Sequence, residues 1–198
     1  MRLLFVHAHP VPESFNAALC AAALETARAQ GHDVRLIDLH AEGFNPVMST
    51  DERRGYTEDV PLPADLVHQV EALQWAEGLI LVYPTWWYSQ PAILKGWMDR
   101  VWRPGIAFTL HEEGQRLRPA LANIRLIGVI TSFGSPWWFW TFLIGAPGRK
   151  IVLRGLRFCT NRRTKTFWLG LHEIDDQTEA SRKRYIDKVR ARIAQIPL

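Results

Sequence analysis

Residues 78–101 of the chain read GLILVYPTWWYSQPAILKGWMDRV, and this stretch decides the fold class. Its first six residues are apolar throughout, which is typical of a strand covered on both faces of a sheet. Pro84 ends that strand, and Pro91 suits the first turn of a helix that we expect to reach about Trp102. A buried strand followed directly by a helix is the unit from which parallel sheets are built.

The same alternation of strand and helix patterns continues on both sides of this stretch. We expect further strands at residues 3–6, 34–37, 126–130 and 163–169, and helices at 16–30, 65–75, 147–154 and 179–193. Residues 40–64 show no period and are expected to be mostly loop. The pattern predicts an α/β fold: one domain, residues 1–198, with a doubly wound sheet of five mostly parallel strands and helices on both faces.

Composition narrows the class of protein. The chain has 198 residues, of which 47% are hydrophobic and 22% charged, which excludes a disordered, collagen-like or disulfide-framework chain. The two cysteines, Cys20 and Cys159, are expected to be free thiols in a reducing cytoplasm. The longest aromatic and apolar run, 137–146, is about half of the ~20 residues that a membrane helix needs. These features predict a soluble cytoplasmic protein.

Charge is distributed unevenly along the chain. Between Gly114 and His172 there are ten Lys or Arg residues and no Asp or Glu, whereas the whole chain carries a net charge of only +4. A basic half could meet cofactor phosphates, nucleic acid or an anionic membrane, or it could be a solvated face that balances the acidic half. The basic residues are not interleaved with a known nucleic-acid module, so we expect no nucleic-acid partner.

Tryptophan is concentrated in one part of the chain. Seven of the nine tryptophans lie between residues 86 and 140. They could form a Trp-rich core, an oligomer contact or the wall of a binding site.

In a doubly wound sheet, ligands bind beyond the carboxyl ends of the strands. The first such turn, residues 8–16, offers His9, Ser14, Asn16 and the free amides of a helix start, which suit a phosphate or pyrophosphate. It lacks the G-x-G-x-x-G and Walker A patterns. The alternatives are that Ser14 is only a helix cap and His9 only a loop residue.

Two further turns carry aromatic residues at strand ends. In residues 84–91, three consecutive aromatics could wall a flat conjugated ring, or the loop could bury itself in a partner subunit. The turn at 131–136 is small and polar and precedes Trp137-Trp138-Phe139-Trp140. It could hold the polar edge of the same ring, or the aromatic block could be a patch for a partner or a membrane surface.

Several other chemistries are not supported by the sequence. No Cys or carboxylate set with ligand spacing surrounds His7 and His9, so we expect no metal site. A G-x-S-x-G elbow is absent, which argues against a serine nucleophile. Cys20 falls inside an apolar helix and is expected to be inert. His111, Glu112 and Glu113 are expected in a solvated hairpin loop.

Taken together, these turns resemble the flavodoxin-like NAD(P)H:quinone oxidoreductase family, over most of the chain. The most specific match is residues 83–101, which contain a P-x-x-W-[FY]-x-x-P-A-x-L-K-G-W pattern. His9, Ser14, Phe15 and Asn16, and then residues 105–108, agree with the family in order and spacing. The resemblance implies a flavodoxin-like fold, a homodimer, and a flavin cofactor, FAD or alternatively FMN.

The resemblance also implies roles for individual residues. The flavin phosphates and adjoining sugar chain would be held by His9, Ser14, Phe15 and Asn16. The isoalloxazine would be lined by Pro84, Thr85, Trp86, Trp87 and Tyr88, and its pyrimidine side contacted by Thr131, Ser132, Phe133 and Gly134. Glu179 and Arg182 would reach an adenosine end.

The implied activity is hydride transfer from NAD(P)H to the flavin and then two-electron reduction of a quinone-like acceptor, in a ping-pong sequence. The chain departs from the family at the third turn, where Phe133 replaces a glycine and an aromatic block replaces a supporting Tyr and His. The candidate catalytic residues are Tyr88, Arg149 and Lys150, of which Arg149 or Lys150 would supply the missing positive charge. A second departure is Glu13, an acid beside the phosphate turn.

Two rival functions remain open. One is an electron-carrying flavodoxin, although such proteins are acidic and lack the P-A-x-L-K-G-W segment. The other is a non-catalytic or weakly catalytic regulatory flavoprotein subunit of a membrane transporter, bound at the membrane through residues 137–144 and nearby arginines.

Overall fold

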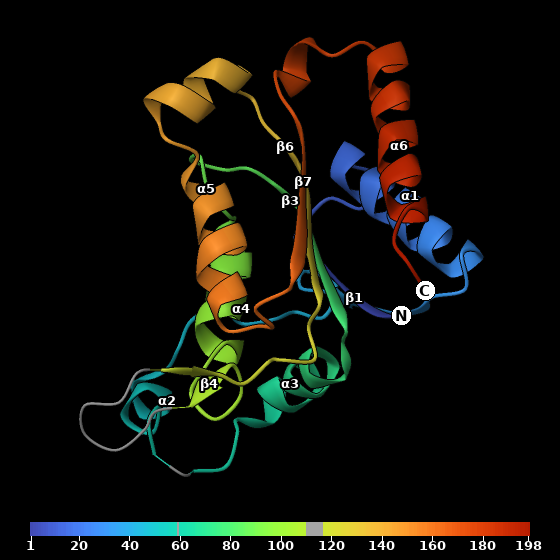
Figure 1. Cartoon of the computed structure of the whole chain (residues 1–198). Helices are drawn as coiled ribbons and strands as arrows, with labels where there is room; N and C mark the ends of the chain where they lie inside the picture. The colour runs from blue at the N-terminus through green and yellow to red at the C-terminus, as the bar shows by residue number, and fades with distance from the viewer. Residues whose placement is uncertain (59, 110–116) are drawn as a thin grey trace.

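The computed structural model describes residues 1–58, 60–109 and 117–198. A parallel five-stranded sheet runs through its centre in the order β2-β1-β3-β6-β7 (Figure 1). This order, with helices on both faces, confirms the predicted flavodoxin-like fold class. The strands are β1 (Arg2–His7), β2 (Asp33–Asp38), β3 (Gly78–Pro84), β6 (Leu126–Ser132) and β7 (Lys165–Leu171).

The most apolar strand occupies the middle of the sheet. β3 pairs with β1 on one side, where Leu3 lies opposite Gly78, and with β6 on the other, where Leu126 lies opposite Gly78. Every residue of β3 and of β6 is buried. A strand with neighbours on both edges and helices on both faces has no solvent side, which explains the unbroken apolar run.

Two helices cover one face of the sheet and three cover the other. α1 (Phe15–Ala29) and α6 (Glu179–Ala194) pack together with β1 and β3 around Leu19, Ala23 and Val189. On the opposite face lie α3 (Ala64–Trp75), α4 (Ala92–Val101) and α5 (Pro147–Lys150), the last continuing as a π-helical segment, η2 (Ile151–Leu156). Trp97 and Trp102, two of the seven clustered tryptophans, are both buried in this second cluster.

Short elements fill the connections. The stretch expected to be loop, 40–64, contains the five-residue helix α2 (Thr50–Arg54). β4 (Phe108–Thr109) pairs antiparallel with β5 (Arg118–Pro119), and the hairpin loop expected at His111, Glu112 and Glu113 lies outside the described residues. η1 (Phe139–Leu143) is a π-helical turn and η3 (Ile174–Asp176) a 3₁₀ turn. Among the described residues, no helix combines the length and the hydropathy needed to cross a bilayer.

Both cysteines are free and buried, as predicted. Burial raises the pKa of the Cys20 thiol to about 12, and it also raises the pKa of Cys159. Since the thiolate is the reactive form, we expect neither cysteine to react with iodoacetamide in the native protein at pH 7.5. Mass spectrometry should find no adduct after an hour, and two adducts when the same reaction is run in urea. Rapid labelling of native Cys20 would contradict this burial.

Candidate functional site

The three sequence-predicted turns meet at the carboxyl edge of the sheet. The Ala8 amide donates to the Val82 carbonyl at 3.0 Å, and the Thr85 amide donates to the Ser132 carbonyl at 2.8 Å. The Thr85 and Thr131 hydroxyls lie 2.9 Å apart, within hydrogen-bonding distance. The rings of His9 and Trp86 have centroids 6.2 Å apart. The ends of β1, β3 and β6 therefore form one continuous surface, as expected for adjacent parallel strands.

The first turn presents the start of α1. The Ser14 hydroxyl accepts from the Ala17 amide at 3.1 Å, so this side chain is a helix cap. The amides of Phe15 and Asn16 precede the first amide that donates within the helix, that of Ala18, and are free to bind an anion. Glu13 is exposed, and burial lowers the pKa of His9, which favours its neutral form.

Asn16 is the most informative residue of this turn. Its side chain is only 3% exposed, yet neither its amide nitrogen nor its oxygen has a hydrogen-bond partner. A buried amide without partners costs free energy, on the order of 1–3 kcal/mol. An orphaned donor at a helix N-terminus is what a phosphate-bearing ligand would satisfy.

The second turn is strained. Trp86 and Ser89 exchange two backbone hydrogen bonds of 3.1 Å, while Trp87 and Tyr88 have φ angles of 47° and 64°. The left-handed region costs a residue with a side chain roughly 1–2 kcal/mol. This conformation leaves the backbone amides of Trp87 and Tyr88 without backbone acceptors at the surface, where the Trp87 side chain is 92% exposed. Strain of this kind is typical of functional sites.

A hollow of about 290 Å³ lies between the second and third turns. It is lined by Thr85, Trp87, Tyr88, Phe133, Gly134 and Ser135. Of the other predicted ring-binding residues, Pro84, Thr131 and Ser132 are buried, and Trp86 is half-exposed. The structure thus brings Tyr88 to the hollow together with the predicted ring-binding residues.

Residues that the sequence interpretation missed brace the third turn. Phe133 stacks on His172 with centroids 4.1 Å apart and planes 7° apart, and it lies 4.6 Å from the Trp140 ring. His172 Nδ1 lies 3.1 Å from the Ser135 carbonyl oxygen. His172 directly follows β7, so the rule that ligand sites lie beyond strand ends could have identified it.

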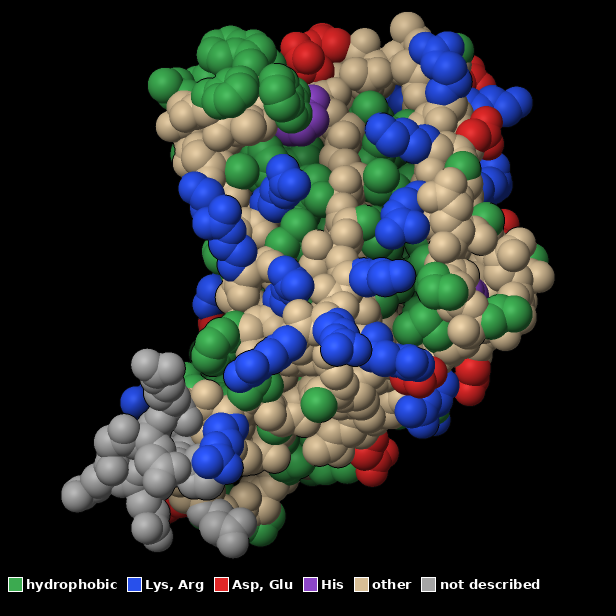
Figure 2. Space-filling model, viewed as in Figure 1, with side chains coloured by type: hydrophobic (Ala, Val, Ile, Leu, Met, Phe, Trp, Pro, Cys, Tyr) green, Lys and Arg blue, Asp and Glu red, His purple; other side chains and the backbone are tan. Residues whose placement is uncertain are grey.

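The aromatic block divides into a buried part and an exposed part. Trp140 is buried, stacks on Trp168, and donates from its indole nitrogen to the Tyr88 carbonyl at 3.2 Å. It therefore supports the strained second turn. Trp137, Trp138, Phe142 and Leu143 are exposed, and Figure 2 shows hydrophobic side chains gathered at the end of the molecule where η1 lies.

Arg149 and Lys150 are not brought to the hollow. Both side chains are exposed on α5. Arg149 lines a different depression, beside Trp137 and Trp168, and neither residue lines the hollow between the turns. Both residues follow the aromatic block closely in sequence. They do not reach the hollow, because their side chains point outward from a short surface helix.

Glu179 and Arg182 lie at the start of α6. Glu179 is exposed. Arg182 donates from Nη2 to the Ile174 carbonyl at 3.1 Å, and the Ile174 amide donates to the Phe133 carbonyl at 2.9 Å. Arg182 is therefore connected to the third turn, and its Nε is buried without a partner. As for metals, the described residues contain no group of three or more His, Cys, Asp or Glu side chains placed to hold an ion.

The half-buried position of His172 has a consequence for pH dependence. Burial is the largest influence on its pKa and lowers it below the ordinary value of 6.5, against the opposing effect of the Ser135 carbonyl. Between these two pKa values the unfolded chain binds a proton that the folded chain does not, so the free energy of unfolding falls as pH drops through 6.5. We expect His172→Gln to lose less stability than the native protein between pH 7 and 5 in urea titrations. Substitution of the exposed His68 by Gln is the control, and identical pH dependence in all three proteins would contradict the assignment.

Known proteins share this architecture. A family model described as flavodoxin-like fold matches residues 1–193. An NAD(P)H oxidoreductase of Haemophilus influenzae is 34% identical, with 89% of this chain and 88% of that protein covered. A ribosyldihydronicotinamide dehydrogenase-like protein of Penicillium crustosum is 35% identical over 59% of this chain and 49% of its own length. The crystal structure of Smu.1420 from Streptococcus mutans superposes with a TM-score of 0.83 at 28% identity and covers 99% of this chain and 100% of that chain.

Coverage differs among these relatives. The match spans about half the length of the first curated relatives, which include the Penicillium protein and rat NAD(P)H dehydrogenase [quinone] 1. It spans nearly all of the Haemophilus protein and of the Streptococcus structure. Because the family model covers almost the whole chain and the site lies at the carboxyl edge of its sheet, the chain belongs to the flavodoxin-like fold family.

Proposed function

We propose that this protein is a flavin-dependent NAD(P)H dehydrogenase that transfers two electrons from NAD(P)H to a quinone-like acceptor. The observation that carries this proposal is the strained Trp86–Ser89 turn beside the hollow, with two free amides and an aromatic wall. Relatives named NAD(P)H oxidoreductase and NAD(P)H dehydrogenase [quinone] support it.

The residues of the site fit a flavin. The phosphates would be held at the start of α1 by the unpaired side-chain amide of Asn16, the backbone amide of Phe15 and His9. Ser14 caps that helix start. The ring system would be lined by Pro84, Thr85, Trp86, Trp87 and Tyr88. Its pyrimidine side would be contacted by Thr131, Ser132, Phe133 and Gly134. Arg182, with Glu179, would reach an adenosine end, so FAD is the cofactor that we propose, with FMN as the alternative.

A bound flavin would supply the two-electron redox chemistry between NAD(P)H and the acceptor. The protein supplies position and exclusion of water. Trp140 fixes the Tyr88 carbonyl, and the His172 stack fixes the Phe133 ring, so the free amides of the second turn are held at a constant separation from the third turn. Preorganised amide donors of this kind stabilise charge without reorganising during the reaction.

The exposed aromatic side chains favour a homodimer. Trp87 lines the hollow, and Trp137, Trp138, Phe142 and Leu143 form an exposed apolar group on the segment that follows the third turn. Burial of such a patch by a second copy would close the substrate site from one side. We place the single domain, residues 1–198, in the cytoplasm.

The same patch supports a second candidate, a regulatory flavoprotein subunit of a membrane transporter that makes peripheral contact with the membrane. Turnover separates the two candidates, because a regulatory subunit would bind flavin and reduce acceptors slowly. Copurification with a membrane protein at low turnover would favour it.

The purified protein is expected to be yellow, or to become yellow with added FAD or FMN. Visible absorbance should fall on addition of NADH or NADPH without oxygen and return on addition of menadione, and mass analysis of the released flavin identifies the cofactor. A colourless protein that takes up neither flavin would overturn the proposal.

The Trp87→Ala variant, which removes the exposed wall, is expected to lower menadione turnover at least tenfold. Val67→Ala, which shortens an exposed apolar side chain on α3 outside the lining of the hollow, is the control.

A further inference from the structure

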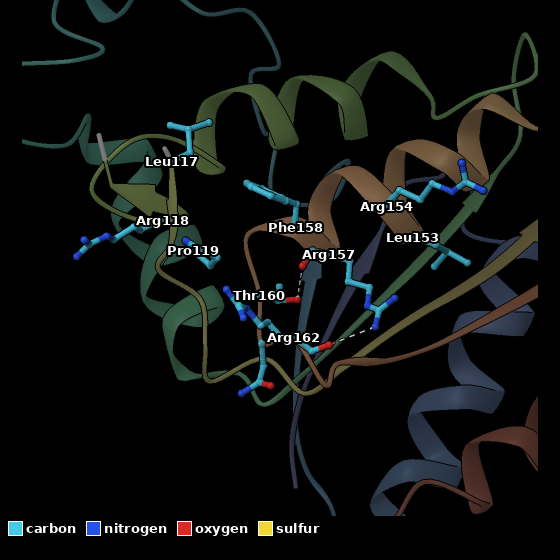
Figure 3. A pocket seen from close by; sticks show the side chains of 10 residues that line it. Leu117, Arg118, Pro119, Leu153, Arg154, Arg157, Phe158, Thr160 and Arg162 are labelled. Atoms are coloured by element: carbon cyan, nitrogen blue, oxygen red, sulfur yellow. Dashed lines mark hydrogen bonds between the residues drawn. The ribbon is translucent and has the colours of Figure 1, made fainter. Parts of the chain in front are cut away.

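A second and larger hollow lies at the opposite end of the sheet. It has a volume of about 810 Å³ and is formed by β5, the end of η2 and the turn that leads into β7 (Figure 3). We call it the arginine groove, after Arg118, Arg154, Arg157 and Arg162, which line it. The groove shares no lining residue with the hollow between the second and third turns.

Within the part of the chain that the structure describes, the four arginines of the groove pair with no carboxylate. No Asp or Glu occurs between Gly114 and His172, and no ion pair joins any of these four guanidinium groups to a carboxylate within the described residues. The contact that Arg157 makes is a donation from Nη2 to the Arg162 carbonyl at 3.4 Å. Figure 2 shows Lys and Arg side chains gathered over β7 and η2 with few acidic side chains among them. Several cations along one groove create a positive potential that attracts an anion.

The floor of the groove is rigid. Thr160 and Thr164 are both buried, and the Thr160 hydroxyl interacts with the Arg157 carbonyl at 2.8 Å and with the Thr164 hydroxyl at 3.0 Å. The Thr164 hydroxyl in turn reaches the Ile124 carbonyl at 2.8 Å. This relay ties the turn that carries Arg157 and Arg162 to the edge of β6. The arginines therefore extend from a fixed backbone, and a ligand would not have to order that backbone on binding.

One wall of the groove is apolar. The Phe158 side chain is 59% exposed, although its chain neighbours Cys159 and Thr160 are buried. Leu153 and Leu117 also line the groove. An exposed phenyl ring among guanidinium groups offers a stacking surface for a flat ring whose attached charges meet the arginines.

We propose that the arginine groove binds a small organic polyanion of the nucleoside diphosphate class, with its phosphates on the arginines and its ring against Phe158. The volume is that of a small-molecule site, whereas a membrane or a nucleic-acid strand would need a longer or flatter surface. Guanidinium forks match phosphate oxygens in geometry as well as charge. This ligand site is separate from the proposed flavin site.

The test is calorimetric titration of the full chain, saturated with flavin, with two probes: ADP and inorganic pyrophosphate. Both probes are expected to bind, and the affinity should fall as NaCl is raised. The double variant Arg157→Ala/Arg162→Ala should lose at least tenfold in affinity for both. The charge-matched control Arg28→Ala/Arg184→Ala, which removes two exposed arginines elsewhere, should change affinity less than twofold.

Phe158→Ala separates ring recognition from charge recognition. It should lower the affinity for ADP at least threefold and leave the affinity for pyrophosphate unchanged. Thermal unfolding of each variant establishes that it is folded, and visible absorbance reports flavin content. The titration can also be run on flavin-free protein, so failure of the flavin proposal does not decide this one. Three results would overturn the assignment. The first is that neither probe binds, and the second is that the native protein and the Arg157/Arg162 variant bind the probes equally. The third is that a single-stranded oligonucleotide or anionic vesicles bind and ADP does not.

Discussion

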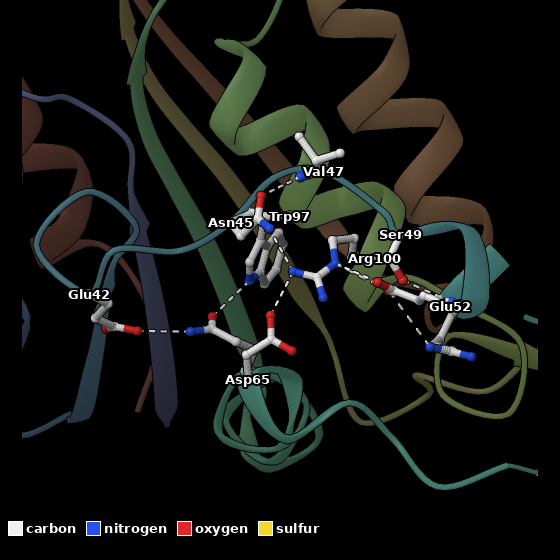
Figure 4. A network of polar contacts seen from close by, with 10 residues as sticks. Glu42, Asn45, Val47, Ser49, Glu52, Asp65, Trp97 and Arg100 are labelled. Carbon is white, nitrogen blue, oxygen red and sulfur yellow. Dashed lines mark hydrogen bonds and ion pairs between the residues drawn. The ribbon is translucent and has the colours of Figure 1, made fainter. Parts of the chain in front are cut away.

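Arg100→Met is expected to lower the free energy of unfolding by about 3–5 kcal/mol, the usual cost of breaking a buried ion pair by removing one partner. Arg100 lies on α4 and joins three segments that are distant in sequence (Figure 4). Its Nε donates to Glu52 Oε2 at 2.9 Å, and its Nη1 donates to Asp65 Oδ2 at 2.7 Å and to the Asn45 carbonyl at 2.6 Å.

The cost arises mainly at Glu52. Its side chain is 4% exposed, and its next cation, Arg103, is 3.9 Å away. Without Arg100, a carboxylate removed from water loses its charge-assisted hydrogen bonds, whereas the half-exposed Asp65 can be solvated. The loss should therefore be smaller in Arg100→Met/Glu52→Gln, which also removes the stranded charge.

Urea titration measures these differences, with Lys95→Met as the control on the same helix. Lys95 pairs with Asp99 four residues along, and both side chains are 51% exposed, so its removal should cost only about 0.3–0.5 kcal/mol. A loss below 1 kcal/mol for Arg100→Met, or a double variant less stable than the single one, would contradict this account.

Periodicity predicted the sheet because burial on both faces leaves an unambiguous pattern. Residues 78–83 and 126–130 are apolar throughout, and both became central strands. The structure of residues 40–64 was harder to predict than the sheet, because it depends on contacts with residues that are distant in sequence. Ser49 caps α2 locally, but Glu52 is buried only because Arg100 meets it.

The Gly96 position illustrates the same limit. A Cβ at Gly96 would clash with the Pro46 carbonyl oxygen, so the glycine of the P-A-x-L-K-G-W segment is required by the close approach of a distant loop to α4. The sequence pattern identifies the glycine, but only the structure gives its cause.

The candidate site was predictable as far as strand ends define it. The turns that follow β1, β3 and β6 meet because parallel strands end at one edge. What depends on packing was not predictable: the left-handed Trp87 and Tyr88, the Trp140 bond to the Tyr88 carbonyl, and the His172 stack. Arg149 and Lys150 follow the aromatic block in sequence but lie on an outward-facing helix.

Asn16→Leu is expected to weaken flavin binding about tenfold to a hundredfold and at the same time to leave the flavin-free protein as stable as before or more stable. The two effects have one cause. In the flavin-free protein, both polar atoms of the Asn16 side chain are buried without partners, and leucine of similar size removes that penalty. A hydrogen bond to a charged phosphate contributes about 1.5–3 kcal/mol, and 1.4 kcal/mol corresponds to a factor of ten in affinity.

This opposite change in binding and stability separates a binding residue from a structural one. Asn123→Leu is the matched control, because the Asn123 amide donates to the Gln74 and Ala76 carbonyls at 3.0 and 2.7 Å. Its removal should lower stability and leave flavin affinity unchanged. Flavin affinity is measured by quenching of flavin fluorescence, and stability by urea titration of the flavin-free proteins. If Asn16→Leu destabilises the flavin-free protein and binds flavin with native affinity, Asn16 is part of the packing of α1 and the phosphates must be held elsewhere.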